Sequence, residues 1–68
     1  MERQPVISSN IKSVGYDEDT ETLEVEFKKG ALYQYDSVPA EVHQSLMSAP
    51  SVGKYFSANV KKYKCRKL

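Results

Sequence analysis

The segment from Leu23 to Pro39 constrains the fold of this chain more than any other. From Leu23 to Phe27, apolar and charged residues alternate with a period of two, as in a strand with one buried and one wet face. Gly30 then marks a turn, Tyr33 to Tyr35 form the next strand, and Pro39 starts a helix. The segment therefore predicts the order strand, turn, strand, helix.

The turn after the first of these strands decides which sheet face Tyr33 and Tyr35 occupy, because a shift of one residue moves every side chain to the other face. A two-residue loop of Lys29 and Gly30 would force the lysine to a positive φ and would leave both tyrosines facing solvent. A three-residue loop that starts at Lys28 avoids this strain and places both tyrosines opposite apolar residues of the preceding strand. We favour the three-residue loop.

The N-terminal part is less regular. Residues 1–9 show no periodicity and are predicted to be a flexible lead-in. Residues Ile11 to Tyr16 are a plausible strand, and the acidic segment Asp17 to Thr22 suits a short exposed turn to the next strand. Strict alternation divides the first strand between the two faces, with Val14 and Tyr16 on one face and Ile11 and Ser13 on the other.

Two short helices are predicted after the strands. The first runs from Pro39 to Met47 and ends at Ala49-Pro50, because α geometry is disfavoured before proline. The second starts at Ser51 as N-cap, and Val52, Tyr55, Phe56 and Val60 follow with helical spacing. The predicted fold class is α+β: a three-stranded antiparallel β-meander followed by two short helices packed on one face, within one domain over residues 10–68.

Length and composition agree with this prediction. A chain of 68 residues with 40% apolar and 28% charged residues has room for one small globular domain. It has no apolar run long enough for a membrane span and no signal-peptide core near Met1, so we expect a cytoplasmic protein, with a monomer favoured. The single Cys65 cannot form an internal disulfide, and an inert thiol is favoured over a reactive one.

Charge is distributed unevenly although the net charge is only +1. Most acidic residues lie in the first half of the chain, whereas no acid occurs from Lys54 to Leu68. This asymmetry suggests an anionic partner. The alternative interpretation is that the cations need no partner: they belong to a solvated helix end and tail, where they face the negative end of the helix dipole. The cations concerned are Lys54, Lys61, Lys62, Lys64, Arg66 and Lys67.

Residues 8–68 resemble the KTSC domain, a family named for the C-terminus of some lysyl-tRNA synthetases and also found as small bacterial or phage proteins. The tyrosine-x-tyrosine signature of that family matches Tyr33 and Tyr35. The resemblance implies a shared fold, and attachment to a synthetase suggests RNA or tRNA as a partner. The other matching segments are Ser9-Asn10-Ile11, Val14-Gly15-Tyr16-Asp17, Leu23-Glu24-Val25-Glu26-Phe27, Gly30, Val38-Pro39, and Gly53-Lys54-Tyr55-Phe56 with Asn59.

Two kinds of binding module follow from these observations. An RNA-binding module would use the cations for phosphates and the tyrosines for stacking on unpaired bases, although core tyrosines could not stack. A protein-interaction module would use the basic segment for an acidic partner or the sheet edge for strand addition. The candidate nucleic-acid-binding residues are Tyr33, Tyr35, Lys54, Lys61, Lys62, Lys64, Arg66 and Lys67.

Enzyme chemistry is not predicted. No spacing in the sequence brings His43 and Cys65 together as base and nucleophile, and the same two residues lack compact metal-ligand spacing. The three glycines form no phosphate-binding fingerprint. We therefore expect no catalytic residue, no metal and no cofactor.

Overall fold

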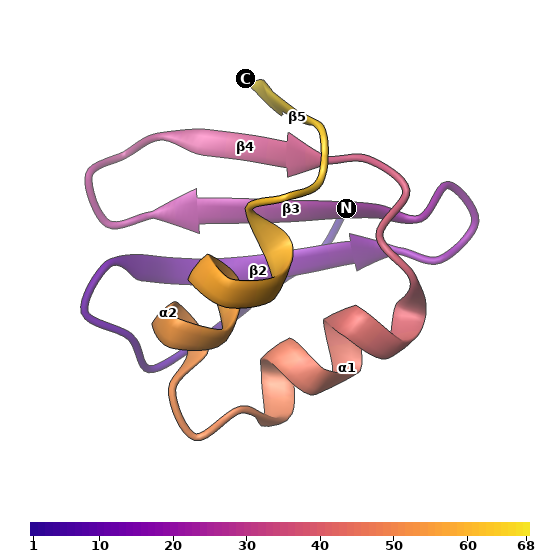
Figure 1. Ribbon diagram of the computed structural model, residues 1–68. Helices are drawn as coiled ribbons and strands as arrows, with labels where there is room; N and C mark the ends of the chain where they lie inside the picture. The colour runs from indigo at the N-terminus through magenta and orange to yellow at the C-terminus, as the bar shows by residue number, and fades with distance from the viewer.

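The computed structural model describes residues 1–68 as a five-stranded antiparallel sheet with two helical segments on one face (Figure 1). The strands lie in the order β1-β2-β3-β4-β5, and the helices are inserted between β4 and β5. The elements are β1 (Arg3–Pro5), β2 (Ile11–Asp17), β3 (Thr22–Phe27), β4 (Leu32–Tyr35), α1 (Ala40–Ser48), α2 (Val52–Tyr55), the π-helix η1 (Phe56–Val60) and β5 (Cys65–Lys67).

The predicted fold class is confirmed in its α+β character and its two helices on one face, but the count of three strands is incomplete. Strands β1 and β5 pair with β2 and β4 and form the two edges of the sheet. Each has three residues, which is too short for a period-two pattern, and the partner of β5 also lies far away in sequence. Residues 1–9 thus contribute a strand, while their flexibility stays a prediction.

The β3–β4 hairpin has the register that we favoured. Val25 lies opposite Tyr33 and Leu23 lies opposite Tyr35, so both tyrosines share the apolar face. The Phe27 N–H donates to the Ala31 carbonyl at 2.9 Å, which closes a three-residue loop. Gly30 has φ +100°, a backbone conformation that residues with a side chain rarely adopt.

Strand β2 contains an irregularity that the alternation did not predict. The register shifts between Ile11 and Ser13, and the β-bulge takes up one extra residue. Ile11 and Val14 are consequently both buried on the helix side, at 0% and 1% exposure. The prediction that Ile11 and Val14 face opposite sides is wrong for this reason.

The helices begin and end where the sequence indicates. Pro39 is extended, and its carbonyl accepts from the Val42 N–H at 3.0 Å at the start of α1. The Ser51 Oγ accepts from the Lys54 N–H at 3.4 Å at the start of α2, which continues directly into η1. None of the helices combines the length and the apolar content needed to cross a membrane.

The hydrophobic core lies between the sheet and the helices. It joins residues of β2, β3 and β4 to the inward faces of α1, α2 and η1. Apolar contacts therefore attach each helical segment to the same face of the sheet. The buried members are Ile11, Val14, Leu23, Val25, Tyr35, Val38, Leu46, Val52, Phe56 and Val60.

Candidate functional site

The two hairpin turns of the sheet carry opposite charges. Successive turns of an antiparallel meander lie at opposite ends of the sheet, and Figure 1 shows this for the β2–β3 and β3–β4 turns. The β2–β3 turn carries Glu18, Asp19 and Glu21, whereas the β3–β4 turn carries Lys28 and Lys29. The acidic turn is therefore remote from the surface around the basic turn.

A groove of about 530 Å³ opens beside the basic turn, and we call it the aromatic groove. Its aromatic residues come from β3, β4 and η1, and its lysines come from the β3–β4 turn and the residue after η1. Aromatic residues next to three lysines favour a ligand that combines a flat ring with negative charge. The lining residues are Ser9, Asn10, Phe27, Lys28, Lys29, Ala31, Tyr33, Tyr35, Phe56 and Lys61.

The aromatic side chains of this groove hold one another edge to face. The Phe27 ring meets Tyr33 at 5.7 Å between centroids and Phe56 at 5.6 Å, with interplanar angles of 87° and 76°. Tyr35 meets Phe56 at 5.5 Å and 85°. Such T-shaped pairs are favourable, so the groove has a rigid aromatic wall.

The two tyrosines of the signature differ in exposure. Tyr35 is only 5% exposed, and burial raises the pKa of its hydroxyl to about 12, with smaller contributions from Cys65 and Tyr33. Tyr33 is half-buried and keeps part of its ring at the groove. Tyr33 therefore offers ring surface to a ligand, whereas Tyr35 is almost fully enclosed.

The predicted cations do not form one patch. Lys61 lines the aromatic groove, and Lys67 in β5 lies opposite Tyr33 in the strand register. Lys54 lines a second groove, described below, and Lys62 places its Nζ 5.7 Å from the centre of the Tyr63 ring. Lys64 is exposed just before β5.

Arg66 lies on the other face of the sheet, because strand alternation turns it away from Lys67. Its guanidinium donates to Asp36 Oδ2 at 3.1 Å and to Gln34 Oε1 at 2.8 Å. These contacts use one N–H of each terminal nitrogen, and the rest of the exposed guanidinium has no partner within the protein. Arg66 thus holds Gln34 and Asp36 on the outer face, and its role as a phosphate contact stays a prediction.

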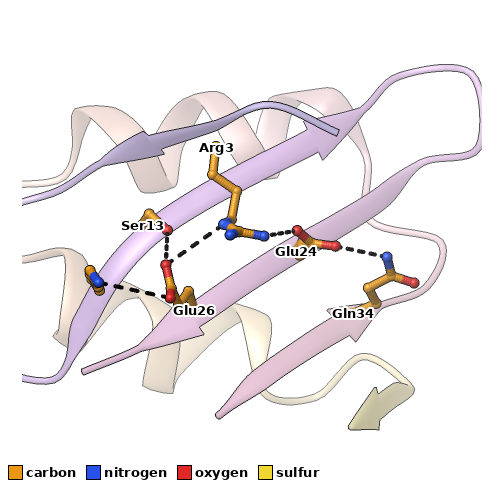
Figure 2. Close-up of polar contacts among 6 residues, drawn as sticks. Arg3, Ser13, Glu24, Glu26 and Gln34 are labelled. Carbon is orange, nitrogen blue, oxygen red and sulfur yellow. Dashed lines mark hydrogen bonds and ion pairs between the residues drawn. The ribbon is translucent and has the colours of Figure 1, made fainter. Parts of the chain in front are cut away.

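Arg66 belongs to a chain of polar contacts that crosses the outer face of the sheet, and we call it the polar ladder: Arg3, Glu24, Gln34, Arg66 and Asp36. Figure 2 shows Arg3 reaching from β1 to Glu24, and Gln34 donating to Glu24 Oε1, a distance of 2.9 Å. Glu24 is only 6% exposed, although alternation predicted a wet position. Burial opposes its ionisation, but hydrogen bonds from Gln34 and Arg3 and the charge of Arg3 prevail, so the pKa of Glu24 is lowered.

A second groove, of about 810 Å³, lies beside the first, and we call it the hydroxyl groove. It runs between the segment before β2 and the start of α2, and Ser9 and Asn10 line both grooves. Gly53 lets the two segments approach, since a Cβ there would lie 3.1 Å from Asn10 Oδ1. The lining residues are Ile7, Ser8, Ser9, Asn10, Pro50, Ser51, Val52, Gly53, Lys54, Ser57 and Ala58.

The residues considered for enzyme chemistry lie in separate places. The His43 ring stacks on Tyr16 at 4.7 Å between centroids, and burial lowers the pKa of its imidazole. Cys65 is exposed in β5, opposite Tyr35. No group of three or more His, Cys, Asp or Glu side chains is placed to hold a metal ion.

Sequence reasoning missed the lysines of the turn and both phenylalanines of the aromatic groove. Lys28 and Lys29 were considered only as turn residues. The favoured register placed Tyr33 opposite Val25, close to the β3–β4 turn. It could therefore have indicated that Lys28 and Lys29 lie beside an aromatic face. The approach of Lys61 to this face depends on the path of η1, which no local pattern shows.

The geometry defines a small α+β domain whose sheet carries helices on one face and a ligand-sized groove at one end of that face. The sequence matches the KTSC domain over residues 7–63. The chain belongs to the KTSC domain family.

Two solved or curated proteins show how widely the domain occurs. A crystal structure of a KTSC domain protein from Yersinia pestis matches with a TM-score of 0.93 and 49% identity, covering 98% of this chain and 96% of that one. An uncharacterised protein of Stutzerimonas stutzeri is 49% identical over 57 residues, which are 84% of this chain and 80% of the relative. Both are therefore similar in nearly their whole length.

A third relative is much larger. A lysine–tRNA ligase of Nostoc punctiforme is 41% identical over 61 residues, which are 88% of this chain but only 11% of the ligase. The chain thus resembles one small part of that enzyme. Neither the family description nor the Yersinia pestis structure indicates a catalytic activity for the domain itself.

Proposed function

We propose that this domain is a non-catalytic module that binds single-stranded RNA at the aromatic groove. The observation that carries the proposal is the convergence of Lys28, Lys29 and Lys61 on a groove walled by aromatic side chains. Proteins that bind single strands combine cations for the phosphates with aromatic rings for the bases. Tyr33 and Phe27 are the half-buried rings of this groove, and they offer their exposed surface to a base.

The distribution of charge supports an anionic strand. The net charge of +1 would by itself give a weak attraction, but the acidic β2–β3 turn lies at the end of the sheet opposite the groove. A strand on the groove therefore meets Lys28, Lys29, Lys61 and the adjacent Lys67 without passing the acids. The similar segment within a lysine–tRNA ligase supports RNA as the class of partner.

Protein interaction through strand addition is less well supported. Both edge strands have only three residues; β1 ends in Pro5 and β5 contains Arg66 and Lys67. Short edges with proline or charge are the devices by which sheets resist pairing with another chain. An acidic protein would meet the same lysines as RNA, so the test includes an acidic polypeptide.

The test is fluorescence anisotropy with a labelled single-stranded RNA over a series of salt concentrations. If the three groove lysines each neutralise one phosphate, the slope of log K against log salt is about −2. Polyglutamate at equal charge should compete weakly, because it supplies no ring for the aromatic wall. Absence of RNA binding at low salt, or equal binding of polyglutamate, would contradict the proposal.

Two triple variants with the same change of charge locate the surface. Lys28→Gln, Lys29→Gln and Lys61→Gln together should weaken binding roughly tenfold or more, because all three lysines line the groove. Lys12→Gln, Lys62→Gln and Lys64→Gln remove three exposed lysines outside the groove and should have a smaller effect. Equal losses in the two variants would place the RNA elsewhere.

A further inference from the structure

The two grooves share a wall, and this juxtaposition extends the site beyond one nucleotide. Ser9 and Asn10 line both the aromatic groove and the hydroxyl groove, so the surface passes from one to the other at these residues. Lys61 lines only the aromatic groove, and Lys54 lines only the hydroxyl groove. A path with a cation at each end therefore passes Asn10 in its middle.

The two grooves differ in chemistry in a way that matches the parts of a nucleotide chain. The aromatic groove offers rings, which suit a base. The hydroxyl groove offers the side chains of Ser51 and Ser57, whose O–H groups donate to no partner within the protein and can bind ribose hydroxyls and phosphate oxygens. The ribose 2′-hydroxyl is the group by which a protein distinguishes RNA from DNA.

Asn10 is held in place at the junction. Its Oδ1 accepts from the Ser8 Oγ at 2.9 Å, and its backbone carbonyl accepts from the Lys28 N–H at 2.9 Å. Gly53 leaves room for the Asn10 amide, because a Cβ there would lie 3.1 Å from Oδ1. The side chain is exposed, and its amide N–H groups have no partner within the protein.

From these contacts we infer that the grooves form one continuous track for consecutive ribonucleotides. An unpaired base lies in the aromatic groove, Asn10 donates a hydrogen bond to the nucleotide at the junction, and the next sugar and phosphate lie in the hydroxyl groove toward Lys54. Asn10 is a binding residue of the track, and Lys54 marks its far end. The inference rests on the proposed function, since it names the path that the RNA takes.

The test compares a dinucleotide with a hexanucleotide of the same RNA, because only the longer chain can reach both ends of the track. Hexanucleotide affinity should fall about three- to tenfold for each of Asn10→Ala, Lys54→Gln and Lys61→Gln. Dinucleotide affinity should fall with Lys61→Gln and not with Lys54→Gln. A DNA hexamer of the same sequence should bind more weakly than RNA.

Two matched variants serve as controls. Lys62→Gln removes the neighbouring charge outside the grooves, and Asn59→Ala removes an amide that donates to the Tyr55 carbonyl within its own helix. Neither should change hexanucleotide affinity. The Lys54 side chain is exposed and forms no hydrogen bond or ion pair within the protein, so Lys54→Gln keeps the test independent of any folding defect in Asn10→Ala.

The outcomes separate the track from the proposed function. If Lys61→Gln weakens the hexanucleotide while Lys54→Gln and Asn10→Ala do not, RNA binds at the aromatic groove alone and the track is wrong. If RNA does not bind, or binds without regard to Lys61, the proposed function and the track both fail.

Discussion

The two faces of the sheet are closed by different physical means. On the helix side, ten buried residues around Val25 and Phe56 exclude water by apolar contact. On the outer side no helix is present, and Glu24 is shielded by Arg3 from β1 and by Gln34. An apolar face needs a second layer of structure, whereas a polar face can be closed by its own side chains when each charge has a partner.

This difference explains where the candidate site lies. The polar ladder engages Arg3, Gln34 and Arg66 with acceptors inside the protein, and each of its charged groups has an opposite charge beside it. The helix side ends in the aromatic groove, where the core meets solvent and lysines have no acidic partner among the ion pairs. The groups that can bind a ligand are thus the groove lysines, which form no ion pair within the fold.

The largest effect is expected from removing the aromatic centre of the helix side. Phe56 is 1% exposed and touches both Phe27 and Tyr35, so Phe56→Ala should cost about 3–5 kcal/mol of unfolding free energy. A domain of this size rarely has more than about 3–5 kcal/mol in its core, and the variant should be largely unfolded. Circular dichroism with urea measures this loss. Tyr63→Ala, at a half-buried ring, is the control, and an equal loss there would contradict a core centred on Phe56.

A smaller effect is expected where the edge strand β1 pairs with β2 at Gly15, which lies opposite Arg3. A Cβ at Gly15 would lie 2.9 Å from both the Glu2 carbonyl and Arg3 Cγ, so Gly15→Ala should displace β1 and cost about 1–3 kcal/mol. Hydrogen exchange should show loss of protection in the β1–β2 pair but not in β3–β4. If β1 protection is unchanged, the N-terminal residues do not close the outer face as described.

The smallest effect is expected from the ladder itself, and it depends on pH. Because the folded-state pKa of Glu24 is lowered, its ionised form contributes stability above the ordinary pKa of 4.5, and this contribution is lost as pH falls through the folded-state value. Arg3→Ala should cost about 1 kcal/mol at neutral pH and raise the pKa of Glu24. Carboxyl NMR titration measures the shift, with Lys12→Ala as the control because Lys12 pairs with Glu26 only at 4.0 Å. An unchanged pKa of Glu24 in Arg3→Ala would show that Arg3 does not hold it.

Local patterns predicted the central hairpin and both helices because the signals lie within a few residues of one another. Loop length and Gly30 determined the β3–β4 register, and Ser51 marked the start of α2. The edge strands could not be predicted in this way, since Arg3 and Arg66 acquire strand geometry only by pairing with β2 and β4. The β2 bulge likewise depends on pairing with β3, which keeps Ile11 and Val14 on the same side.

The candidate site was predictable only in its residue types. Lys61 and Tyr33 were chosen from charge and signature, and the structure brings both to one groove. Arg66 was chosen by the same charge argument, yet alternation along β5 turns it to the outer face. Lys28 and Asn10 reach the groove through the sheet and the loop before β2, and such contacts between distant segments follow from the fold and not from a motif.

The most direct test of RNA binding at the aromatic groove is an amide NMR titration of the labelled domain with single-stranded RNA at low and high salt. We predict salt-sensitive shifts at Phe27 to Ala31, Tyr33 and Lys61, with the side-chain amide of Gln34 on the outer face unmoved. Absence of shifts at low salt, or shifts confined to the polar ladder, would contradict the account.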